Sequence, residues 1–155
     1  MEALLAAMML WLSANFGLAG TSDHPSVTIV PATEILFRRY DARDPDKQRE
    51  LLAKTTEIAS AHKGRSIVAI YDRSTKAIML PEGWSGTTAA ELSVLLHELV
   101  YHLQDASNLR YECPAAREQL AYAAQEKWLA LFGQSLESEF DIDPFTLKVS
   151  TTCGF

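Results

Sequence analysis

Short apolar runs bounded by turn residues predict the strands of this chain. The first run is Ser26 to Val30, which a proline ends. Two more, Ser66 to Tyr71 and Lys76 to Leu80, flank the polar stretch Asp72 to Thr75 in the pattern of a β-hairpin. A further run near the end of the chain, Phe145 to Val149, is interpreted as a last strand or an extended arm. We therefore expect a small antiparallel sheet.

Apolar residues spaced three and four positions apart predict three main helices. The expected segments run from Asp44 to Gly64, from Thr88 to Asp105 and from Pro114 to Gly133. Asp, Ser or Thr before the apolar pattern, proline in the first turn and glycine after the last turn are the usual boundary signals. Glu34 to Tyr40 fits a strand and a helix equally well. Together with the sheet, these helices predict an α+β domain.

The beginning of the chain differs from the rest. Ala3 to Leu12 contains ten apolar residues without a charge, and small residues follow it. A run of this length is typical of a secretory leader and is shorter than the ~20 residues that span a bilayer. Glu2 stands where a leader usually carries a cation, and a buried N-terminal helix is the alternative. We expect residues 1–20 to be a signal peptide and residues 21–155 to form one exported domain, periplasmic or secreted.

Length and charge narrow the classes of protein further. A chain of 155 residues, 48% apolar and 22% charged, has the size and balance of one globular domain. The net charge is −6, and the longest basic cluster is Arg38-Arg39. Nucleic-acid binding requires a concentrated positive face, so we expect no nucleic-acid partner.

Cys113 and Cys153 are the two cysteines of the chain. An even number of cysteines in an exported protein indicates a disulfide, and closing this loop would stabilise the fold by about 4 kcal/mol. Two buried free thiols are the alternative. Neither cysteine has a second Cys or a His at the spacing of a zinc finger, which disfavours a zinc site built on them.

The segment His97-Glu98-Leu99-Val100-Tyr101-His102 carries the candidate chemistry. Two histidines four residues apart on a helix can bind one zinc ion, and a Glu directly after the first serves as general base. Here the fourth residue after His97 is Tyr101, and His102 comes one step later. At about 100° per residue, Tyr101 lies some 40° from His97 around the helix and His102 about 140° away. Only a π-bulge would bring His102 to His97.

The string Leu96 to Gln104 resembles the active helix of a bacterial family of predicted zinc metallopeptidases with a gluzincin-like arrangement. The resemblance covers most of the chain after the expected leader. It extends to Ile70–Asp72, Leu80–Trp84, Cys113, Glu118, Ala121, Tyr122, Gln125, Trp128, Leu129 and Cys153. In that family a histidine ligand falls where this chain has Tyr101.

This resemblance implies a hydrolase of peptide bonds that uses one zinc ion. His97 would be the first ligand, Glu118 a ligand from the following helix, and Tyr101 or His102 would take the remaining position. Glu98 would be the catalytic general base. Glu118 has the alternative interpretation of a surface residue whose charge suits a helix N-terminus.

The resemblance also places a substrate cleft and a cross-link. The strand Lys76 to Leu80 and Trp84 would flank the cleft, where an extended peptide of a protein substrate pairs with a strand edge. A Cys113–Cys153 disulfide would fasten the end of the chain beside the helix of Glu118.

Tyr101 leaves three outcomes open. It is an unusual ligand, a bulge recruits His102 instead, or the chain has lost its metal and kept the fold. In the last case we expect an exported, non-catalytic binding module on a zincin scaffold. A disulfide-bonded structural protein is the remaining alternative.

Overall fold

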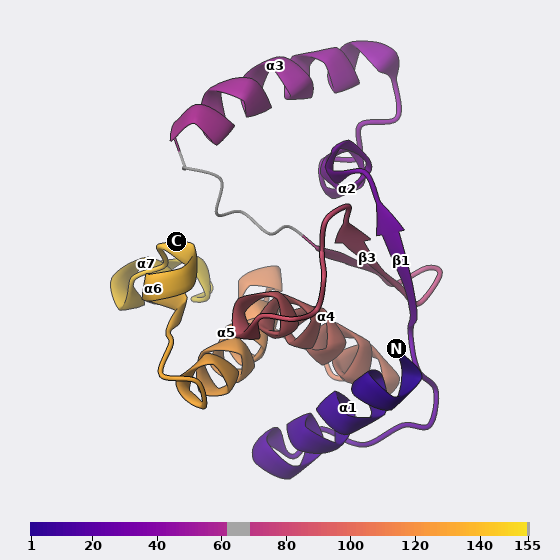
Figure 1. The fold of residues 1–155 in the computed structure, drawn as a ribbon, viewed down its shortest axis with the longest axis vertical. Helices are drawn as coiled ribbons and strands as arrows, with labels where there is room; N and C mark the ends of the chain where they lie inside the picture. Colours follow the sequence, from indigo (N-terminus) through magenta and orange to yellow (C-terminus); the bar gives the residue numbers. More distant parts are fainter. Residues whose placement is uncertain (62–68, 155) are drawn as a thin grey trace.

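The computed structural model describes residues 1–61 and 69–154, with the backbone alone over 55–61. It confirms the α+β class (Figure 1). The elements are α1 (Glu2–Phe16), β1 (Ser26–Val30), α2 (Ala32–Arg39), α3 (Pro45–Ala61), β2 (Ile70–Asp72), β3 (Ala77–Pro81), α4 (Ala89–Ala106), α5 (Pro114–Ala130), α6 (Leu136–Phe140) and α7 (Pro144–Ser150). The ambiguous stretch 34–40 belongs to a helix, α2, rather than to a strand. The three predicted helices correspond to α3, α4 and α5.

The sheet has the strand order β1-β3-β2. The predicted hairpin is present, since β2 and β3 pair antiparallel with Tyr71 opposite Ile78, although 66–68 lie outside the described residues. The expectation of a wholly antiparallel sheet is wrong, because β1 pairs with β3 in parallel. Parallel neighbours need a long crossover connection, and α2 and α3 lie in the connection between these two strands.

Strand β3 is central, and its first four residues are buried. Burial on both faces is typical of a strand that reads as a continuous apolar run. Strand β3 therefore has no free edge, and in the part of the sheet that the structure describes the edge strands are β1 and β2.

Helix α4 is the centre of the molecule. It packs against α5, α1 and the sheet, and its residues Leu95, Leu96, Leu99 and Leu103 are fully buried. Its start is a capping box: the Thr88 side chain accepts from the Glu91 N–H, and the Glu91 side chain accepts from the Thr88 N–H. The helix is regular from end to end.

Helix α1 occupies the segment interpreted as a signal peptide, and it packs into the core. Leu5, Met8, Met9 and Leu12 are at most 3% exposed, and the Trp11 ring meets the Trp128 ring edge-on with centroids 5.5 Å apart. In Figure 1, α1 and the sheet lie on different sides of α4. Removal of residues 1–20 on export stays a prediction. Among the helices of the described residues, none is both long and apolar enough to cross a membrane.

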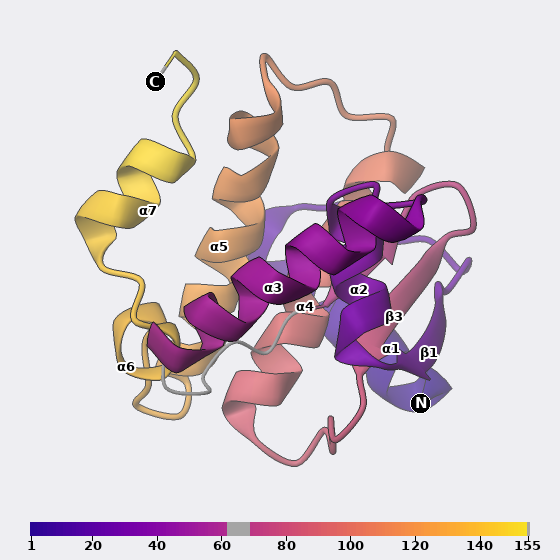
Figure 2. The same cartoon turned by 90° about the horizontal axis from the view of Figure 1, so that it is seen from above.

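The C-terminal part is helical. The expected strand or arm over 145–149 is wrong, because these residues belong to α7. The Asp143 carboxylate caps this helix by accepting from the N–H groups of Phe145 and Thr146 at 2.8 and 3.0 Å. In Figure 2, α6 and α7 lie beside α5, on the side away from the sheet.

The predicted disulfide is present. Cys113 and Cys153 are bonded, with their Cα atoms 5.9 Å apart. Because Cys113 is the N-cap of α5, the bond ties the end of the chain to the start of that helix. Disulfides of this kind are typical of exported proteins.

Candidate functional site

Three of the predicted ligands lie together where α4 and α5 pack side by side. His97 and Tyr101 are one turn apart on α4, and Glu118 is near the start of α5. The Nε2 atom of His97 lies 3.0 Å from the Tyr101 hydroxyl and 3.5 Å from Oε2 of Glu118. Ligand atoms around a tetrahedral zinc ion with bonds of about 2.0–2.1 Å are about 3.3 Å apart. The two distances from His97 Nε2 lie on either side of that value, and they are also the distances of a hydrogen bond and an ion pair.

The Tyr101 oxygen is essential to that arrangement. Among the described residues, no group of three or more His, Cys, Asp or Glu side chains is placed to hold a metal ion. A three-ligand site at this position thus consists of one imidazole nitrogen, one phenol oxygen and one carboxylate.

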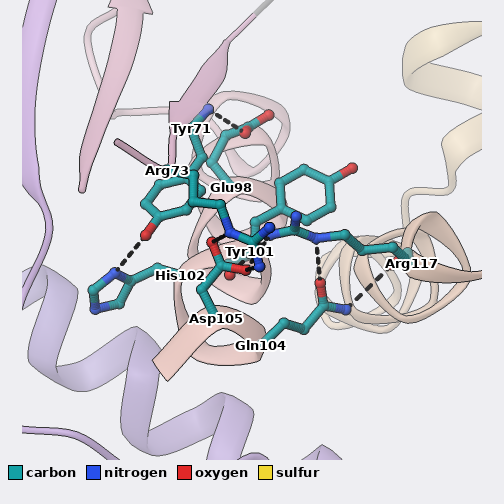
Figure 3. Close-up of polar contacts among 8 residues, drawn as sticks. All are labelled: Tyr71, Arg73, Glu98, Tyr101, His102, Gln104, Asp105 and Arg117. Atoms are coloured by element: carbon teal, nitrogen blue, oxygen red, sulfur yellow. Dashed lines mark hydrogen bonds and ion pairs between the residues drawn. The ribbon is translucent and has the colours of Figure 1, made fainter. Parts of the chain in front are cut away.

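His102 does not join His97. Its Nε2 atom lies 2.6 Å from the Asp23 carbonyl oxygen, and its Nδ1 atom lies 3.3 Å from the Tyr71 hydroxyl (Figure 3). The residue is 2% exposed and belongs to another side of α4. The regular helix keeps the two histidines apart, as the angle of about 140° between them predicts.

Glu98 lies at the free edge of the sheet. Its carboxylate accepts a hydrogen bond from the backbone N–H of Tyr71 at 2.8 Å (Figure 3), and the residue is 6% exposed. Burial raises the pKa of the Glu98 carboxyl, while His97 and the Tyr71 N–H oppose the shift. A raised pKa makes this carboxylate a stronger proton acceptor than an exposed glutamate.

Tyr101 is enclosed by polar and aromatic neighbours. The guanidinium of Arg117 lies 4.7 Å from the centre of its ring, and the His97 ring meets it edge-on at 5.1 Å. Burial raises the pKa of the Tyr101 hydroxyl far above its usual range, and the hydrogen-bonded Glu118 carboxylate raises it further. Without a metal the hydroxyl is therefore a neutral hydrogen-bond donor.

Glu118 remains ionised. Burial alone would raise the pKa of its carboxyl, but the contacts with His97 and Tyr101 outweigh burial and lower it. Glu118 lies near the start of α5 with its side chain 37% exposed, and its carboxylate faces His97 on the neighbouring helix.

The opposite side of the His97 ring contacts Gln125, two turns after Glu118 on α5. Nδ1 of His97 lies 3.1 Å from Oε1 of Gln125, whose Nε2 donates to Ser93 Oγ at 3.1 Å. Tyr122 packs its ring against His97 with centroids 4.7 Å apart. The seven-residue spacing of Glu118 and Gln125 was a usable sequence signal, since such residues share a helix face.

Arg117 forms a network that sequence reasoning missed (Figure 3). It donates to Gln104 Oε1 at 3.1 Å, to the Tyr101 carbonyl at 3.2 Å and to Asp105 Oδ1 at 3.0 Å. Arg73, from the β2–β3 turn, donates to both oxygens of Asp105 at 3.0 and 2.8 Å. The network joins the last turns of α4, the start of α5 and the hairpin. Its members come from three segments of the chain, so no local sequence pattern predicts the network.

Comparison with known proteins adds the family but no activity. Residues 1–154 match one family model, described as a domain of unknown function. The searches of curated proteins and of solved structures gave no match. The function is therefore argued from the site itself.

Proposed function

We propose that this chain, which belongs to the DUF6647 family of unknown function, is a zinc-dependent hydrolase of peptide bonds. His97, Tyr101 and Glu118 would hold the zinc ion, and Glu98 would be the general base. The observation that carries the proposal is the spacing of 3.0 and 3.5 Å from His97 Nε2 to the two oxygen ligands.

The chemistry of these donors fits zinc with one condition. The Glu118 carboxylate is ionised, and Gln125 occupies the Nδ1 side of His97, which leaves Nε2 toward the site. The Tyr101 phenol must lose its proton, and its raised pKa makes that loss costly. We therefore expect weaker zinc binding than at a site with two histidines and a glutamate, and weaker binding as the pH falls.

Zinc held by three protein ligands polarises carbonyl groups and activates water. Glu98 then supplies the proton transfer: its carboxylate takes a proton from water and returns it to the leaving amine. The Tyr71 N–H holds this carboxylate in place. An extended segment of a peptide or protein substrate would bind along the β2 edge beside Glu98, where the Tyr71 N–H is bonded to the Glu98 carboxylate.

An exported location accompanies this proposal. The Cys113–Cys153 disulfide is of the kind that persists in oxidising compartments. We propose a periplasmic or secreted protein on this ground.

A second candidate function is favoured by the same tyrosine. The Tyr101 hydroxyl contacts both His97 Nε2 and Glu118, so the three groups satisfy one another without a metal. In this alternative the chain is an exported, non-catalytic binding module that keeps the zincin arrangement.

Zinc content after loading and desalting separates the two functions. The variants are Tyr101→His and His97→Ala, with the exposed His24→Ala as a control for loss of a histidine outside the site. One zinc per chain in the parent and in His24→Ala, but none in His97→Ala, supports the metal site. Zinc in Tyr101→His alone favours the binding module, and no zinc in any variant refutes the site.

Hydrolysis is then tested on a mixed peptide library with the zinc-loaded parent. Glu98→Gln keeps the three ligands and removes the base, so we expect it to retain zinc and lose cleavage. Cleavage that persists in Glu98→Gln would contradict the role of this carboxylate.

A further inference from the structure

Gln125 contacts the His97 ring from the side opposite to Tyr101, and Ser93 contacts Gln125. Ser93 lies one turn before His97 on α4, and Gln125 lies on the facing helix α5. Both are deeply buried, Ser93 at 0% and Gln125 at 5% exposure. The distances from Gln125 Oε1 to His97 Nδ1 and from Gln125 Nε2 to Ser93 Oγ are both 3.1 Å. The three side chains form one line of hydrogen bonds across the two helices.

The direction of these hydrogen bonds follows from their last member. Ser93 Oγ lies 2.7 Å from the carbonyl oxygen of Ala90, which can only accept, so the single hydroxyl hydrogen points there. Ser93 Oγ must then accept from the amide NH₂ of Gln125. This turns the amide oxygen of Gln125 toward His97. An amide oxygen only accepts, so the facing Nδ1 of His97 carries a hydrogen.

We infer that Gln125 and Ser93 are positioning residues that hold His97 in one tautomer, with hydrogen on Nδ1 and the lone pair on Nε2. That lone pair faces the Tyr101 hydroxyl, which can donate to it at 3.0 Å. The use of this tautomer in zinc binding rests on the proposed function, whereas the tautomer itself does not. Histidines that bind metals almost always donate their other N–H to a neighbouring group, which fixes ring and tautomer.

The reverse tautomer of His97, with hydrogen on Nε2, is disfavoured at both ends of this row of hydrogen bonds. It would set the Nδ1 lone pair of His97 against the Gln125 oxygen, two acceptors at 3.1 Å. Rotating the amide to relieve this contact would set the same oxygen against Ser93 Oγ, whose hydrogen is already used. Either arrangement leaves a buried polar atom without a partner, which costs roughly 1–3 kcal/mol.

His102 provides an internal comparison on the same helix. Its Nε2 faces the carbonyl oxygen of Asp23 at 2.6 Å, so Nε2 carries the hydrogen. Its Nδ1 then accepts from the Tyr71 hydroxyl at 3.3 Å. The two histidines are therefore expected in opposite tautomers.

Long-range ¹H–¹⁵N correlation spectra of the imidazole rings test this inference. The sample is the ¹⁵N-labelled full chain at neutral pH with zinc removed by a chelator, and signals are assigned with His97→Gln and His102→Gln. We expect a protonated Nδ1 and an unprotonated Nε2 for His97, and the reverse for His102. A protonated Nε2 with an unprotonated Nδ1 at His97 would overturn the inference.

Substitutions then test the two positioning residues. Gln125→Leu removes the acceptor, so His97 should shift toward the other tautomer while His102 is unchanged. Gln125→Glu keeps an acceptor and should keep the His97 tautomer, and the exposed Gln119→Leu on the same helix should change nothing. Ser93→Ala gives a second, smaller perturbation if Gln125→Leu does not fold. An unchanged His97 spectrum in both Gln125→Leu and Ser93→Ala would refute the positioning role.

Zinc affinity separates this inference from the proposed function. If the parent binds zinc, Gln125→Leu should weaken binding about 10–100-fold. Full affinity in that variant would refute the role of the two positioning residues in metal binding. The expected tautomers in a parent that binds no zinc would support the positioning inference and contradict the proposed function alone.

Discussion

Replacement of Glu91 by Gln offers a direct test of how the start of α4 is held. The carboxylate accepts from the backbone N–H groups of Ser85, Thr87 and Thr88 at 2.9, 3.2 and 3.3 Å. It also accepts from the hydroxyls of Ser85 and Thr88 at 2.8 and 3.2 Å. Trp84 Nε1 donates to the Glu91 carbonyl at 3.2 Å, so the whole loop before α4 is organised by this residue. Glutamine loses the charge and one of the two acceptor oxygens.

The expected effect follows from the pKa of this carboxyl. Burial would raise the pKa, but the hydrogen bonds from Ser85 and its neighbours lower it from 4.5 to about 2. At 1.36 kcal/mol per unit this difference corresponds to a ceiling of about 3 kcal/mol, and we expect about 1–2 kcal/mol because the side chain is partly solvated.

The dependence on pH has a definite sign. The pKa is lower in the folded state, so the stabilisation is complete above pH 4.5 and is lost as the pH falls toward 2. Since the amide of the Glu91→Gln variant does not titrate, the difference between parent and variant should be largest at neutral pH and shrink below pH 4.5.

Urea unfolding followed by tryptophan fluorescence at pH 7 and at pH 3 measures this difference. Glu82→Gln is the matched control, because Glu82 is an exposed carboxylate of the same loop. A loss of stability in Glu91→Gln that is equal at both pH values, or equal to that of Glu82→Gln, would refute the reasoning.

Three further predictions concern stability. Arg117→Lys loses the forked contacts of the guanidinium to α4, so we expect the free energy of unfolding to fall by about 1–3 kcal/mol in a thermal unfolding experiment. The exposed Arg110→Lys is the control and should change stability little. Equal effects of the two substitutions would contradict the network. A chain that begins at Thr21 loses four almost completely buried side chains of α1, each of which contributes about 1.5–3 kcal/mol to stability. Circular dichroism and urea unfolding should therefore show no cooperative fold. A cooperative unfolding transition like that of the parent would favour a removable leader. Without reductant, Cys153→Ser should be less stable than the parent by about 2–4 kcal/mol. With reductant, the parent and the variant should be equally stable. A difference that persists under reduction would show that the disulfide is not its cause.

The sequence predicted those elements whose signals are local. The start of α4 was visible in Thr88 and Glu91, and the disulfide in the number of cysteines. Helix α7 was missed although Asp143-Pro144 repeats the boundary signal at Asp44-Pro45, because the short apolar run after it was given more weight. The parallel pairing of β1 could not be predicted, since it depends on how the chain between the strands crosses the sheet.

In the candidate site, the contacts within one helix were predictable and the contacts between helices were not. The angles around an α-helix placed Tyr101 beside His97 and His102 away from it. The spacing of Glu118 and Gln125 indicated a shared face of α5, but the partners of Gln125 and Arg117 on α4 depend on the register between the two helices, which follows from packing.

The packing of α1 has a consequence during synthesis. The apolar side of α1 is covered by α4, which ends 90 residues after α1 does, at Ala106 rather than Phe16. At about 5–20 residues per second, a ribosome takes roughly 5–20 seconds to produce that length. For that interval α1 is present without the helix that covers it in the folded molecule. The apolar run Ala3 to Leu12 packs in the folded core. Before α4 is made, this run is accessible to cellular factors that bind apolar nascent segments, such as an export pathway or a chaperone.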